Sequence, residues 1–219
     1  MAAFMELTMD AAEFIWKAPT LIEHQEEIEL AKLDNYFPTD GPKRRLRWKL
    51  ERRKMDEVWP SLMATSNVFS VLSLFEFHLL RLASTVEHRF QLKLREVNRT
   101  GIFRSLEYLR KVGLCDYERL KRWKQVEAAI EIRNALAHAS GVLNHLKNEA
   151  KIRAFIKSGS FLDDNPAASR SHEQFDRCIK IVPSELGDRI QVGNEYPYIL
   201  CFFLNEFFEV MCLACQEHD

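Results

Sequence analysis

Between Ala128 and Ala139 every residue is Ala, Ile or Leu except four, and three of those four are Arg133, Asn134 and His138. A helix that is apolar on almost every side is expected to be buried, so polar side chains within it need partners or must face a cleft. Arginine stays charged at any ordinary pH, whereas histidine exchanges a proton near neutrality. Together they suit chemistry on a phosphodiester, with histidine as acid or base and arginine as a planar donor to phosphate oxygens.

The spacing of these residues indicates how they would cooperate. Asn134 and His138 are four residues apart on one face of a helix, so the amide can orient the imidazole. Arg133 and His138 are separated by about 140° around the helix axis and converge poorly within one helix. Two antiparallel copies would bring Arg133 of one helix toward His138 of the other, and would supply separate histidines as base and acid. The spacing therefore predicts a homodimer with a composite site.

The motif Arg133-Asn134-x-x-x-His138, late in an apolar helix and closely followed by Gly141, resembles the signature of the HEPN family. The order of the surrounding elements is also similar to that family. A long apolar helix containing Glu76 precedes a short helix, the motif helix, a variable insert and a final apolar helix. The resemblance covers roughly residues 61–215.

This resemblance implies a helical bundle in which two motif helices pair. Many HEPN proteins are metal-independent endoribonucleases that act as toxins or antiviral effectors, in some cases under the control of an antitoxin. Arg133 and His138 would then be the catalytic pair and Asn134 the supporting polar residue. Attack by the ribose 2′-OH would leave a 2′,3′-cyclic phosphate. Ser140 stands where an AMP-regulated subgroup carries tyrosine, so we do not expect that mode of control.

Two other readings of the motif stay open. Arg133 could simply pair with a core carboxylate, and Glu76 is the candidate; we expect it to be a structural partner of Arg133 rather than a general base. The chain would then be a helical interaction protein. Alternatively, it could be a non-catalytic HEPN module that binds RNA or nucleotide.

A second candidate region is the segment 43–54, which holds eight basic residues and one acidic residue in a chain of net charge −1. It could contact RNA phosphates, with an aromatic ring available for stacking. It could equally be a solvated helix face, or pair with the acidic stretch at residues 23–29. The candidate RNA-contacting residues are Arg44, Arg45, Arg47, Trp48, Arg52 and Arg53.

The cysteines favour thiols over metal ligands. There are five, an odd number without the spacing of a disulfide framework, which fits a reduced cytoplasmic protein. Cys201, Cys212, Cys215 and His218 superficially suggest zinc, but most lie along one apolar helix and are better explained as buried free thiols. We expect neither a metal nor another cofactor. No continuous apolar run approaches the length of a membrane span, and no signal peptide is evident, so we expect no membrane association.

The remaining sequence predicts an all-α fold with a small β-hairpin insertion. Seven Gly, seven Pro and 47% hydrophobic residues in 219 indicate a mostly helical protein with a substantial core. We expect an N-terminal helical arm at residues 1–41 and a HEPN-like helical domain at 42–219. Helices are predicted at 5–16, 20–37, 43–59, 61–94, 103–112, 117–140, 142–157 and 196–215, with breaks at Pro19 and Pro60, a loop at 158–171 and a hairpin from strands 178–182 and 189–192.

Overall fold

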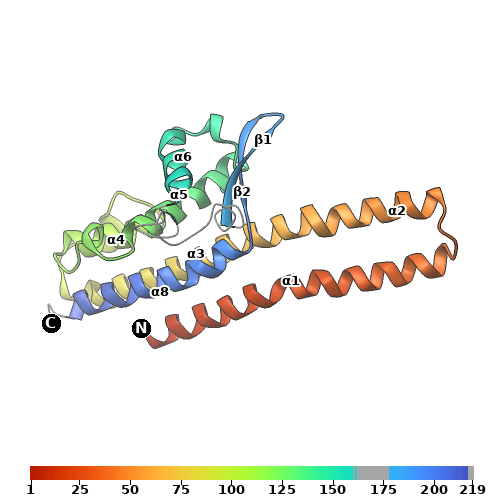
Figure 1. The fold of residues 1–219 in the computed structure, drawn as a ribbon. Helices are drawn as coiled ribbons and strands as arrows, with labels where there is room; N and C mark the ends of the chain where they lie inside the picture. The colour runs from red at the N-terminus through yellow and green to blue at the C-terminus, as the bar shows by residue number, and fades with distance from the viewer. Residues whose placement is uncertain (160, 162–177, 217–219) are drawn as a thin grey trace.

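The computed structural model describes residues 1–159, 161 and 178–216. It confirms an all-α fold with a small antiparallel hairpin (Figure 1). The elements are α1 (Ala2–Tyr36), α2 (Pro42–Arg53), α3 (Trp59–Val86), α4 (Ile102–Lys111), α5 (Trp123–Ala139), α6 (Glu149–Ser158), β1 (Ile179–Ser184), β2 (Gly187–Val192) and α8 (Glu195–Gln216).

The body of the protein is built around α3 and α8, which lie side by side, with the first half of α1 packed against α8. Aromatic side chains join the three helices: the Phe4 ring lies 4.5 Å from Phe208 and 6.0 Å from Phe75, centroid to centroid. α4 packs on α3, and α5 contacts both α3 and α8. The predicted final apolar helix is confirmed, and Leu200, Cys201, Leu204 and Phe207 on it are fully buried.

Residues 20–53 project from the body as a pair of antiparallel helices, which we call the two-helix arm (Figure 1). It combines the second half of α1 with α2. The first half of α1 belongs to the body, since Phe4, Ala12 and Ile15 are buried there. In space, the arm and the body therefore do not separate at residue 41.

The predicted helix break at Pro19 is wrong, because α1 runs without interruption from Ala2 to Tyr36. Proline lacks the N–H that would bond to the carbonyl four residues earlier, at Ile15. Asn194 supplies the missing donor: its Nδ2 lies 2.7 Å from the Ile15 carbonyl oxygen. A side chain from the start of α8 thus replaces a backbone hydrogen bond of α1.

Pro60, expected to start or kink the next helix, lies in the first turn of α3, which follows α2 without an intervening loop. α2 and α3 are joined by a π-helical turn, Lys54–Val58, in which the Trp59 N–H bonds to the Lys54 carbonyl five residues earlier. Such wide turns accommodate irregular backbone within a continuous helix. The apolar stretch predicted to reach residue 94 leaves the α-helical conformation after Val86, where short 3-10 turns follow.

The motif helix is shorter than predicted. Tyr117–Arg119 forms a separate 3-10 turn, and Arg122 has a left-handed backbone (φ 72°), so α5 begins only at Trp123. The helix predicted at 142–157 is likewise divided into a 3-10 turn, Leu143–His145, and α6. The predicted hairpin is confirmed, with Ile181 opposite Ile190. The predicted loop at 158–171 lies largely outside the described residues.

Two helical stretches, Pro42–Arg89 and Glu195–Gln216, are long and apolar enough to cross a membrane by length and composition. This is weak evidence, because core helices of soluble proteins meet the same criteria. The helix Glu195–Gln216 is a core helix here, with 56% of its most apolar window buried. The expected lack of membrane association therefore stays a prediction.

Candidate functional site

Arg133 of the motif helix is held against α3. Its Nη2 lies 3.6 Å from Oε2 of Glu76, and the two side chains are 25% and 38% exposed. This confirms the expected pairing of Arg133 with Glu76. The Nε atom of Arg133 is buried without a hydrogen-bond partner. The guanidinium is thus anchored at one edge and retains unused donor capacity.

The Glu76 carboxylate also lies at the start of α4. Gly101, the residue that precedes this helix, has a left-handed backbone (φ 60°), and a Cβ placed on it would lie 3.4 Å from Glu76 Oε1. The N-terminus of a helix favours a nearby negative charge. Glu76 is therefore held between a cation on α5 and the positive end of α4, which suits a fixed positioning group.

His138 and Asn134 are available to solvent and ligands. His138 is exposed and Asn134 is partly exposed on α5. Neither side chain makes a hydrogen bond to another residue in the described ranges, so the predicted contact between the Asn134 amide and the imidazole is not formed in the single chain. Arg133 pairs with α3 while His138 faces outward, consistent with their angular separation of about 140°.

The hairpin fixes the C-terminal end of α5. Ser140 and Gly141 both have left-handed backbones, and the Gly141 N–H bonds to the Ala135 carbonyl at 3.0 Å. The Gly141 carbonyl accepts the Ile190 N–H at 2.8 Å. Arg189 donates from Nε to the Ser140 carbonyl at 3.1 Å. The turn that carries His138 is therefore tied to β2.

Arg189 is a cation near the motif that sequence reasoning missed. It lies 49 positions after Ser140 along the chain. Because Arg189 lies on a strand outside the motif, the motif residues give no indication of its position. Only the pairing of the hairpin with the residues that follow α5 brings it to the end of the motif helix.

The predicted RNA-contacting residues lie on the two-helix arm, where several pair with acids of this chain. Arg44 bridges to Asp34 of α1 at 2.6 Å, an acid that lies outside the stretch 23–29 expected to pair with this segment. Arg47 pairs with Glu51 at 2.9 Å, Arg52 with Asp56 at 3.1 Å, and Arg45 approaches Asp40 at 4.0 Å. Trp48 is partly buried, and Arg53 is exposed.

The cysteines confirm the prediction of buried thiols. All five are buried, and none forms a disulfide. Burial raises the pKa of Cys115 to about 11 and that of Cys201 to about 12, so both are protonated at neutral pH. Within the described ranges, no three His, Cys, Asp or Glu side chains gather as metal ligands would. His218 lies outside these ranges.

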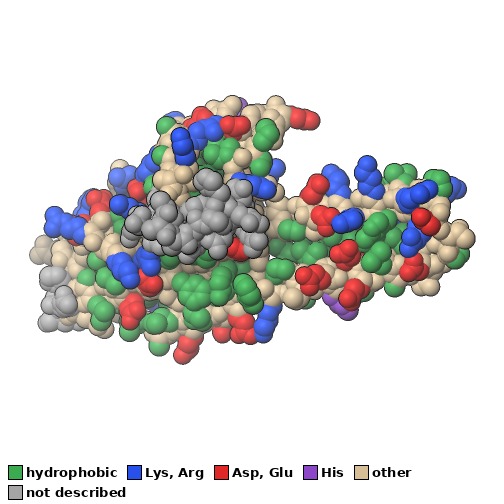
Figure 2. Space-filling model, viewed as in Figure 1, with side chains coloured by type: hydrophobic (Ala, Val, Ile, Leu, Met, Phe, Trp, Pro, Cys, Tyr) green, Lys and Arg blue, Asp and Glu red, His purple; other side chains and the backbone are tan. Residues whose placement is uncertain are grey.

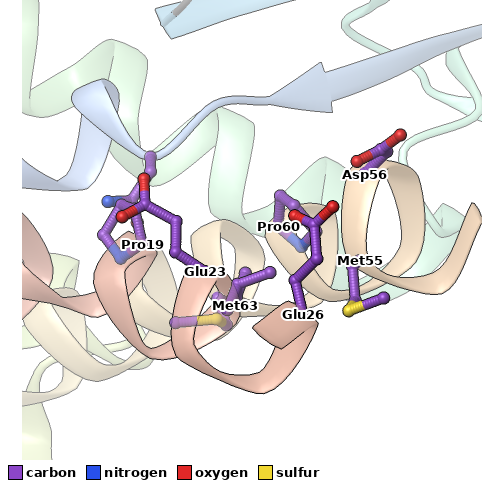
Figure 3. Close-up of a pocket in the computed structure, with 9 residues that line it drawn as sticks. Pro19, Glu23, Glu26, Met55, Asp56, Pro60 and Met63 are labelled. Carbon is purple, nitrogen blue, oxygen red and sulfur yellow. The ribbon is translucent and has the colours of Figure 1, made fainter. Parts of the chain in front are cut away.

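A cavity of about 200 Å³ lies where the two-helix arm leaves the body (Figure 3). Its charged lining is acidic, from Glu23, Glu26 and Asp56, and Asn194 adds a neutral amide. Met55 and Met63 contribute to an apolar floor. None of the motif residues lines it. The cavity and the motif are therefore separate features of the fold.

Comparison with known proteins supplies no relative for this arrangement. No protein-family model, curated protein or solved structure matches the chain. Any functional conclusion therefore depends on the motif and its geometry.

Proposed function

We propose that this chain is a HEPN-type, metal-independent endoribonuclease that acts as a homodimer. The main support is that the polar side chains of His138 and Asn134 have no hydrogen-bond partners among the described residues. They lie in the last part of α5, whose end is tied to β2. A catalytic side chain needs this combination of accessibility and fixed position. A purely structural histidine is more often buried with a partner.

The proposed reaction uses His138 for proton transfer. One imidazole removes the proton of the ribose 2′-OH, whose oxygen attacks phosphorus. The P–O5′ bond then breaks, and an imidazolium returns a proton to the leaving 5′-oxygen. The products are a 2′,3′-cyclic phosphate and a free 5′-OH. Since base and acid act on opposite sides of an in-line displacement, His138 from each of two copies would serve the two roles.

Arg133 would stabilise the negative charge that builds on the phosphate oxygens. Its ion pair with Glu76 leaves other guanidinium donors unused, and Nε is buried without a partner. Glu76 would act by positioning Arg133, and Asn134 by orienting the imidazole once RNA is bound. We propose a cytoplasmic toxin or antiviral effector as the cellular role, with an antitoxin or regulatory protein as a possible partner class.

The activity is tested with labelled RNA in the presence of EDTA. His138→Ala is expected to lower the cleavage rate by about 100-fold or more, the usual contribution of a general acid or base. His145→Ala is the matched control, because His145 is also exposed and lies just beyond the same helix. Its cleavage rate is expected to equal that of the unmodified chain. Absence of cleavage of any RNA, with RNA binding retained, would favour a non-catalytic binding module.

The second candidate function is a helical interaction protein in which the motif is structural. The observation that favours it is the ion pair between Arg133 and Glu76, which gives this largely buried arginine a charged partner on α3. Arg133→Met separates the two functions. A large loss of stability with no effect on RNA cleavage or binding would support the structural role.

A further inference from the structure

The cavity at the base of the two-helix arm carries unneutralised negative charge. Glu23 and Glu26 make no ion pair with any residue in the described ranges. In Figure 3 both extend from α1 to the same side, and Asp56 lies on the neighbouring helical rod. Met55 and Met63 are part of the apolar lining. This end of the arm would bind a surface that offers cations around apolar side chains.

Basic residues lie on the same face of the arm, closer to its tip. Arg45, Lys49, Arg52 and Asp56 follow one another at helical spacings of four, three and four, so they share one face of the rod. Asp56 lines the cavity, which places the three cations on the cavity's side. Lys49 forms no ion pair with a described residue, and the side chains of Arg45 and Arg52 are 67% and 62% exposed. Figure 2 shows acidic and basic side chains interspersed along the arm, around apolar side chains between its two helices.

We propose that this face of the two-helix arm docks against the same face of a second copy of the chain. In an antiparallel arrangement, the basic tip of each arm lies over the acidic base of the other. A two-fold axis forms this contact twice, as an isologous interface requires of a self-complementary surface. The apolar lining between the helices is covered at the same time. The inference concerns the arm alone and does not rest on the proposed ribonuclease activity.

Charge on this face favours a protein partner over RNA. Glu23 and Glu26 would repel the phosphates of a nucleic acid that lay along the arm. They line the cavity together with Asp56, which shares a helix face with the cations. A second arm instead places Lys49, which forms no ion pair with a described residue, and the exposed Arg45 opposite Glu23 and Glu26. A second copy of the protein is therefore the partner that this charge pattern fits best.

The test is a charge swap in the full chain. One variant carries Glu23→Lys and Glu26→Lys, and the other carries Arg45→Glu and Lys49→Glu. Each variant alone has like charges at both ends of the face, so its arm contact is expected to weaken by about tenfold or more. A mixture of the two restores opposite charges at both contacts and is expected to re-form the contact. Lys157→Glu with Lys180→Glu, two exposed positions on the body, is the control that matches the net charge of the Arg45→Glu/Lys49→Glu variant.

The measurement must distinguish contact through the arm from a dimer that forms through another surface. Chains labelled with ¹⁴N and ¹⁵N are mixed and treated with a carbodiimide, which joins amines directly to carboxylates. We expect mixed-isotope links from Lys49 to Glu23 or Glu26 in the unmodified chain, fewer of them at high salt, and none in either variant alone. Sedimentation of the 25.7 kDa chain gives the oligomeric state in parallel.

Three results would overturn the inference. One is a dimer without these links, which would place the interface elsewhere and leave the proposed composite nuclease site intact. Another is a strictly monomeric unmodified chain at low salt. The third is loss of RNA binding in the Arg45→Glu/Lys49→Glu variant with no change in oligomeric state, which would make the arm an RNA surface.

Discussion

The hydrogen bond from Asn194 to the Ile15 carbonyl leads to a double-mutant prediction. Asn194→Ala removes the donor that Pro19 cannot supply, and leaves a partly buried carbonyl oxygen without its 2.7 Å partner. An unsatisfied buried carbonyl costs about 1–2 kcal/mol. We expect the free energy of unfolding to fall by that amount.

The background Pro19→Ala should remove most of this effect. Alanine restores the backbone N–H, which can donate to the carbonyl four residues earlier, at Ile15. In that background we expect Asn194→Ala to cost less than about 0.5 kcal/mol, so the coupling energy is about 1 kcal/mol. Asn67→Ala is the control, because Asn67 only donates a long 3.4 Å hydrogen bond to the Asn194 side chain. It is expected to leave the coupling unchanged.

Urea unfolding followed by far-UV circular dichroism measures all four chains, with the m-value as a check that the transition stays two-state. The diagnostic quantity is the difference between the two Asn194→Ala costs. An equal loss of stability in both backgrounds would refute the idea that Asn194 replaces the missing backbone donor. The continuity of α1 through Pro19 would then need another physical cause.

Three further predictions concern the body of the protein. Glu76→Gln removes the charge partner of Arg133 and should lower the free energy of unfolding by about 0.5–1 kcal/mol, because solvent screens part of this pair. His78 is buried among aromatic rings, and burial, together with the nearby Arg81 charge, lowers its pKa in the folded state. The free energy of unfolding should therefore have its full value above about pH 6.5 and decrease as the pH drops below that value. In urea titrations at several pH values, His78→Leu should make this pH dependence weaker. Gly141→Ala should cost about 1–2 kcal/mol, because the backbone there is left-handed and the new Cβ would lie 3.1 Å from the Ile190 carbonyl oxygen. A thermal melt unchanged by Gly141→Ala would contradict this account of the helix end.

Local periodicity predicted the main elements of the fold correctly. The final helix and the hairpin were recognisable because their apolar spacings are strong and uninterrupted, and the pairing of Arg133 with Glu76 followed from the cost of burying an arginine alone. The errors have a common cause, which is compensation from elsewhere in the chain. Pro19 reads as a helix break until Asn194, 179 positions from Ile15, provides a donor. At Pro60 the expected start of a helix is present, but a π-helical turn joins α2 directly to α3, so no loop separates them.

The candidate site shows the same division. The motif residues are adjacent in sequence and could be identified from their types and spacing. Arg189 could not, because it reaches the end of α5 only through the pairing of the hairpin. Likewise, the left-handed backbone at Arg122 that starts α5 is not encoded by a glycine or asparagine. Residues that act through tertiary contacts are therefore those that sequence reasoning missed.

Cleavage of labelled RNA in EDTA by the unmodified chain, by His138→Ala and by His145→Ala tests the proposed activity most directly. We expect the unmodified chain and His145→Ala to release fragments that end in a 2′,3′-cyclic phosphate, and His138→Ala to be slower by about 100-fold or more. Equal cleavage by all three chains would show that the motif histidine is not the proton-transfer group. It would remove the basis for assigning ribonuclease chemistry to this helix.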